Sequence, residues 1–108
     1  MAEIEGSGSI TPQQKAVYKQ EFVRGADLFK QSFNEYLSAD NDNKKTLLKD
    51  VMERALQVMN ETAKYALSQK KLEQENKLEQ DFDNFISNES PESTKELQND
   101  IDKLQKGL

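Results

Sequence analysis

Apolar and polar residues alternate with the period of an α-helix, most clearly between residues 12 and 37. One stripe of this segment carries aromatic side chains at spacings of 4, 7, 4 and 3, with Ala26 in the gap: Tyr18, Phe22, Phe29, Phe33 and Tyr36. They are five of the chain's eight aromatic residues. Because each ring removes a large apolar area from water, this aromatic stripe must be covered by the chain itself, by a second copy or by another protein.

The first helix has a clear start signal. Thr11 suits the N-cap, Pro12 suits the first helical position, and Gln14 completes a capping box. We expect this helix to end near Leu37, before a turn at residues 38–43 that is rich in Asp and Asn, with Asp42 or Asn43 capping the next helix. Gly25 lies beside the stripe and predicts the close approach of a second helix.

The second helix is predicted to be long, over residues 44–86. Its first part is apolar over a broad arc, including Val51, Val58 and Tyr65, and can be buried on more than one side. Met52 and Met59 either fill gaps against the aromatic stripe or line an adaptable groove. Residues 68–81 contain two apolar residues and several opposite charges at i,i+4, which predicts a solvated continuation. A continuous helix would be roughly 65 Å long. A break near Ser68 is the alternative.

The third helix is predicted over residues 91–106, with Ser90 as its cap, Pro91 at its start and Gly107 at its end. Its apolar residues form a narrow seam of the coiled-coil kind: Leu97, Ile101, Leu104 and Leu108. This seam either packs within the chain or reaches a partner chain.

These elements define an all-α fold: an antiparallel helical hairpin or three-helix arrangement with a long central helix. Residues 1–10 are predicted to be a disordered N-terminal tail, and residues 11–108 a single helical domain. A single layer of helices would leave half of the aromatic surface wet. Either the long helix breaks and the helices close as a bundle, or two chains form a coiled-coil-like dimer, which we favour slightly.

Charge and composition narrow the class of partner. The chain carries 15 basic and 20 acidic residues, a net charge of −5, and the basic residues are interleaved with acids. We therefore expect neither nucleic acid nor an anionic membrane as a partner. The sequence lacks a secretory signal and any apolar run of roughly 20 residues, which favours a cytoplasmic protein.

Catalytic chemistry is poorly supported. The chain has no His and no Cys, and it has no Gly-rich phosphate loop after a strand, so we expect no enzyme activity, cofactor or metal. Asp40 and the three residues after it resemble the opening of a calcium loop, but Lys45 and Val51 occupy the positions that need Gly and Glu. A turn is the better interpretation.

The sequence therefore predicts a non-enzymatic helical interaction module, a small acidic adaptor or chaperone-like protein. Its partner would be another protein or a second copy, with a homodimer slightly favoured. The alternative is an architectural coiled-coil spacer, in which residues 68–81 set a distance. An enzyme that works through carboxylates ranks below both. The residues expected at the core or the contact are Tyr18, Phe22, Phe29, Phe33, Tyr36, Met52, Met59, Leu97, Ile101 and Leu104.

Overall fold

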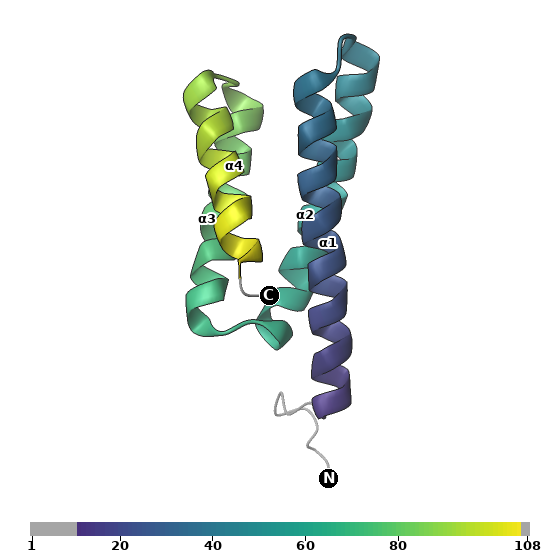
Figure 1. The fold of residues 1–108 in the computed structure, drawn as a ribbon, viewed down its shortest axis with the longest axis vertical. Helices are drawn as coiled ribbons and strands as arrows, with labels where there is room; N and C mark the ends of the chain where they lie inside the picture. The colour runs from purple at the N-terminus through teal and green to yellow at the C-terminus, as the bar shows by residue number, and fades with distance from the viewer. Residues whose placement is uncertain (1–10, 107–108) are drawn as a thin grey trace.

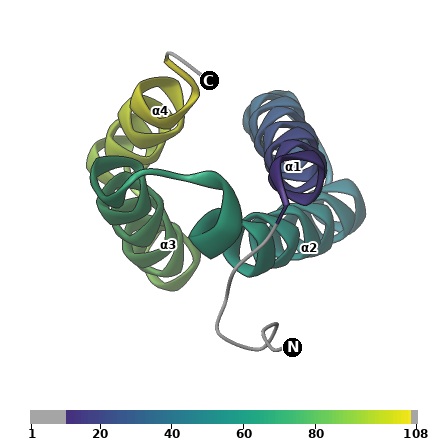
Figure 2. The ribbon, with the colours of Figure 1, turned by 90° about the horizontal axis from the view of Figure 1, so that it is seen from below.

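The computed structural model describes residues 11–106, which form four α-helices and no strand (Figure 1). The predicted tail and the residues Gly107 and Leu108 lie outside this range. The helices are α1 (Pro12–Ser38), α2 (Asp42–Ala66), α3 (Gln69–Ser87) and α4 (Pro91–Gln105). Successive helices run antiparallel, and they form two hairpins, α1–α2 and α3–α4, that lie side by side (Figures 1 and 2). The predicted all-α class is confirmed.

The helix starts follow from capping side chains. At α1 the Thr11 hydroxyl accepts the N–H of Gln14 at 3.1 Å, and the Gln14 side chain accepts the N–H of Thr11 at 3.0 Å. Ser90 caps α4 as predicted. At α2 the cap is Asn41, whose side chain accepts the N–H of Lys44 at 2.8 Å, so the predicted caps at Asp42 and Asn43 were wrong. Asp42 instead lies in the first turn, where its charge favours the helix dipole.

The prediction of one long helix over residues 44–86 was wrong. Helix α2 ends at Ala66, Leu67 is extended, and the Ser68 hydroxyl accepts the N–H of Lys71 at 3.4 Å to cap α3. The physical reason lies further along the chain. In an unbroken helix Phe85 would lie about 30 Å beyond Tyr65, whereas the break turns α3 back so that its aromatic rings reach the stripe on α1. The arrangement has four helices rather than three.

The core lies between the two hairpins, where aromatic rings meet edge to face. The ring of Phe29 lies 5.5 Å from that of Phe82, and the ring of Phe85 lies 5.5 Å from those of both Phe33 and Tyr36. Edge-to-face pairs of this kind stabilise beyond the area that they bury. The aromatic stripe is thus covered within one chain, by α2 on one side and α3 on another.

Within the α1–α2 hairpin, the two helices approach each other closely at Gly25, as the sequence predicted. A Cβ atom at this position would lie 3.0 Å from Cγ of Met59 and 3.2 Å from the carbonyl oxygen of Ala55. Since a glycine inside a helix costs about 1 kcal/mol relative to alanine, the absence of a side chain here serves the packing of the two helices.

Polar contacts join the two hairpins along α1 and α4. The Tyr36 hydroxyl donates to the carboxylate of Glu89. Lys30 lies 3.2 Å from Asp102, and Gln105 donates to Asp27 at 2.7 Å, one turn apart on α1. Apart from the buried Tyr36, these groups are at least partly exposed, so the contacts of Lys30 and Gln105 add little to stability. They fix how the hairpins align, while the aromatic core supplies most of the attraction.

Candidate functional site

The structure places the residues predicted for the core or the contact almost entirely in the core. Nine of the ten are buried: Phe22, Phe29, Phe33, Tyr36, Met52, Met59, Leu97, Ile101 and Leu104. Tyr18 is half-buried, and its ring stacks on that of Tyr65 at 4.6 Å. The aromatic stripe therefore holds the bundle together, and a contact surface must be sought elsewhere.

All of the large apolar side chains that stay exposed within residues 11–106 lie on the α1–α2 hairpin. Residues 11 positions apart on an α-helix point in nearly the same direction, so Val17 shares a direction with Leu28, and Leu47 with Val58. On α1 the exposed fraction is 54% for Val17 and 45% for Leu28. On α2 it is 68% for Leu47 and 37% for Val58. We call the surface formed by these four residues the outer face. It includes four of the five large apolar side chains that are exposed within residues 11–106.

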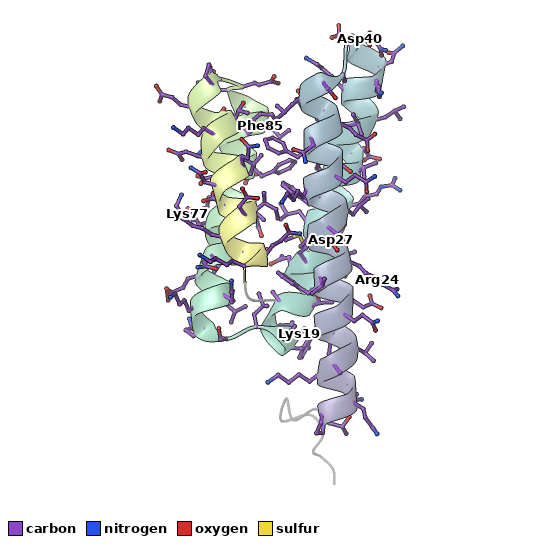
Figure 3. All side chains as sticks on the ribbon, in the orientation of Figure 1. Lys19, Arg24, Asp27, Asp40, Lys77 and Phe85 are labelled. Atoms are coloured by element: carbon purple, nitrogen blue, oxygen red, sulfur yellow. The ribbon has the colours of Figure 1, made fainter. Side chains whose placement is uncertain are left out.

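A shallow groove of about 270 Å³ runs between the two helices of this face. Leu28 and Val58 contribute its exposed apolar lining, and Gly25 lets the helices come together beneath it. Glu21, Arg24 and Arg54 also line it, so the groove carries both signs of charge. Figure 3 shows Arg24 pointing away from α3 and α4, on the opposite side of α1 from Phe85. A protein partner with an apolar ridge and mixed charge could lie here.

Helix α2 carries a second apolar stripe on this side, which we call the α2 outer stripe. It consists of Leu47, Val51, Val58 and Tyr65, at spacings of 4, 7 and 7. With Arg54 and Glu61 included, the positions of the stripe follow one another at alternating spacings of four and three residues. Arg54 and Glu61 are therefore the two charged positions of this stripe. Both are exposed, and Arg54 pairs only with Asp50 one turn away on the same helix, at 3.3 Å. The breadth of apolar character predicted for this helix therefore reflects two stripes, one in the core and one at the surface. In the second stripe Leu47 and Val58 are exposed, whereas Val51 and Tyr65 are half-buried, Tyr65 against Tyr18.

A larger groove, of about 400 Å³, lies between α2 and α3. Two of its apolar residues, Leu56 and Phe82, are only 7% and 3% exposed. They already belong to the core, so a partner in this groove would remove little further apolar surface from water. The outer face offers more exposed apolar surface for a partner to cover.

The α3–α4 hairpin contains buried carboxyl groups that the sequence analysis missed. Glu75 is 1% exposed, and its Oε2 atom has no hydrogen-bond partner. Burial, followed by the nearby charge of Glu79, raises the pKa of Glu75 to about 7. A signal was present in the sequence, because Glu75 continues the 3,4 spacing of Leu78, Phe82 and Phe85. The interpretation of residues 68–81 as solvated was therefore wrong at this position.

A pair of buried acids, Asp81 on α3 and Asp100 on α4, lies between these two helices. Lys77 lies 2.7 Å from Asp81 and 3.5 Å from Asp100, and the buried Oδ2 atom of Asp100 has no hydrogen-bond partner. Burial, followed by the hydrogen bond and charge of Asp81, raises the pKa of Asp100 to about 7. The hydrogen bond with Asp100 lowers the pKa of Asp81. A proton held on Asp100, together with the charge of Lys77, lowers the cost of burying the two acids between α3 and α4.

None of these acids forms a metal site, since no three metal-ligating side chains converge within residues 11–106. The same part of the chain has no helix with the length and apolarity that a bilayer crossing needs. No protein-family model, curated protein or solved structure matches this chain.

Proposed function

We propose that this protein is a non-enzymatic helical interaction module, an acidic adaptor or chaperone-like protein that holds a protein partner on its outer face. One observation carries the proposal: Leu28 and Val58 stay exposed on one groove, and Val17 and Leu47 stay exposed on the same two helices, although the chain buries six of its eight aromatic residues. An exposed apolar groove rimmed by polar groups is typical of protein contact sites. Its rim of mixed charge favours a protein over nucleic acid or membrane.

The architectural alternative has less support. It depended on a long charged helix acting as a spacer, and the break at Leu67 folds that segment back onto the bundle. A cytoplasmic location belongs to the same proposal, and the highly charged composition supports it.

Site-specific photo-crosslinking tests this function. A photoreactive amino acid replaces Leu47, which is 68% exposed, and in a matched variant it replaces Lys95, an exposed residue of α4. We expect one discrete adduct from the Leu47 position in the cells that produce the protein, and none from Lys95. Mass spectrometry identifies the captured chain, and calorimetry with the purified partner then measures its binding. Equal labelling at both positions, or no adduct at Leu47, would contradict the proposed function.

A further inference from the structure

The geometry points to a second copy of this chain as the occupant of the outer face, with the α2 helices of the two copies packed antiparallel along the α2 outer stripe. This inference rests on the proposed function, because it names the partner of the same surface. The reason for a second copy lies in the order of apolar and charged residues along the stripe.

The two charged residues of the stripe are opposite in sign and symmetric about one point. Arg54 and Glu61 lie at equal distances from the midpoint between residues 57 and 58. A two-fold axis perpendicular to α2 at this midpoint reverses the helix of the second copy. Arg54 of each copy then lies level with Glu61 of the other, so the symmetry creates two ion pairs at once. Both side chains are exposed, and each has a partner on its own helix: Arg54 lies 3.3 Å from Asp50, and Glu61 accepts from the Gln57 side chain at 3.5 Å. Exposed contacts of this kind contribute little, so either side chain can exchange its partner for one on a second copy at small cost.

The same axis also aligns the apolar residues of the stripe. At a rise of about 1.5 Å per residue, Val58 of the two copies comes within about 2 Å of the same level, and Val51 comes within about 2 Å of the level of Tyr65 of the second copy. Apolar layers therefore alternate with charged layers along the contact. A shift by one helical turn in either direction would place each charge against an apolar residue, so the charges select this register.

The area available sets the strength of the contact. The stripe from Leu47 to Tyr65 is about 27 Å long, which gives a contact below the roughly 800 Å² per partner of a standard stable interface. Leu28 and Val17, next to the stripe on α1, extend it. We therefore expect a reversible dimer that forms at high protein concentration and weakens as salt screens the two ion pairs.

A charge-swap series with multi-angle light scattering tests this dimer. The mass of the wild-type chain should rise from 12.4 kDa towards twice that value along a concentration series. Arg54→Glu and Glu61→Arg should each raise the dissociation constant by about tenfold or more, because each turns both ion pairs, one on either side of the two-fold axis, into pairs of like charges. The double variant R54E/E61R should restore the wild-type dimer. Lys95→Glu has the same charge change as Arg54→Glu but lies on α4, so it should leave the dimer unchanged.

Circular dichroism checks that each variant keeps its helices, which exposed positions should allow. A wild-type chain that stays at 12.4 kDa at every concentration overturns the inference. A double variant that remains as dissociated as the single ones overturns it as well. If the wild type is monomeric while the Leu47 position captures a different protein, the interaction module stands and only the second copy is wrong. If Leu47 captures nothing either, both proposals fail.

Discussion

At the scale of single residues, Glu75 is the side chain whose burial is hardest to account for. A carboxyl group without a hydrogen-bond partner in an apolar interior avoids its charged form. Its neutral form costs much less to bury, and that is why its pKa is raised to about 7. Because the unfolded chain releases this proton near pH 4.5, Glu75 stabilises the fold fully below that pH. The contribution is lost as the pH rises through 7.

The variant Glu75→Gln should therefore be more stable than the wild type at pH 8 and nearly equal to it at pH 4.5. Glutamine keeps the shape of the protonated acid but cannot ionise. At about 1.4 kcal/mol per pKa unit, the difference at pH 8 should approach about 3 kcal/mol in the free energy of unfolding. Thermal unfolding followed by circular dichroism across this pH range measures it.

The control is Glu73→Gln, which removes an acid from the exposed side of the same helix. Its effect on the melting temperature should vary little with pH. If wild type and Glu75→Gln differ in the free energy of unfolding by the same amount at pH 4.5 and at pH 8, Glu75 is not buried as a neutral acid.

At the scale of elements, helix ends decide the topology. The caps at Thr11 and Ser90 could be predicted because each is followed by proline. Proline is favoured at the first position of a helix, directly after the capping residue. The break near Ser68 could be given only as the alternative to a continuous helix, because residues 69–81 are strong helix formers and Ser68 is a cap without a proline. Its cause lies in the tertiary structure, in the burial of Phe82 and Phe85 against a helix distant in the sequence.

The buried acids show a related limit. Charged residues at i,i+4 on residues 68–81 were interpreted as a solvated face, yet only Lys77 and Asp81 of those pairs are in contact. The aromatic stripe and the seam on α4 could be predicted as buried because their spacing matches one face of a helix. The outer face could not, because it is defined by what the bundle leaves uncovered.

Lys71, in the first turn of α3, contacts the C-terminal end of α4. Its ammonium group donates to the carbonyl oxygens of Lys103, Leu104 and Lys106, at 2.9, 3.0 and 2.6 Å. The last carbonyls of a helix have no partner within the helix and attract positive charge. Lys71 therefore holds the end of α4 against the first turn of α3.

The variant Lys71→Met should lower the free energy of unfolding by about 1 kcal/mol, because it keeps the apolar part of the side chain and removes the donors. Chemical denaturation measures this loss. Lys70→Met is the matched control: it removes the same charge from the exposed neighbouring position and should have a much smaller effect. Equal effects of the two variants would show that the carbonyl contacts contribute nothing.

At the scale of the whole molecule, the account depends on closure of two hairpins around one aromatic core. This closure covers the stripe, so the chain needs no second copy for that purpose. It also leaves the outer face as the surface for association. The proposed interaction module and the proposed dimer both depend on this separation of a buried core from an exposed outer face. If α3 and α4 instead covered the stripe of another chain, the bundle would be built from exchanged hairpins, and the outer face would lose its distinct role.

Chemical crosslinking across the hairpins tests this claim most directly. Lys30 and Asp102, 3.2 Å apart on α1 and α4, are each replaced by Cys in a chain that has no other cysteine, and a short bis-maleimide joins them. We predict that the crosslinked product has the mass of one chain on a denaturing gel at every protein concentration. A dimer held together by the two crosslinks under denaturing conditions would contradict the account, because α4 would then cover the core of a different chain.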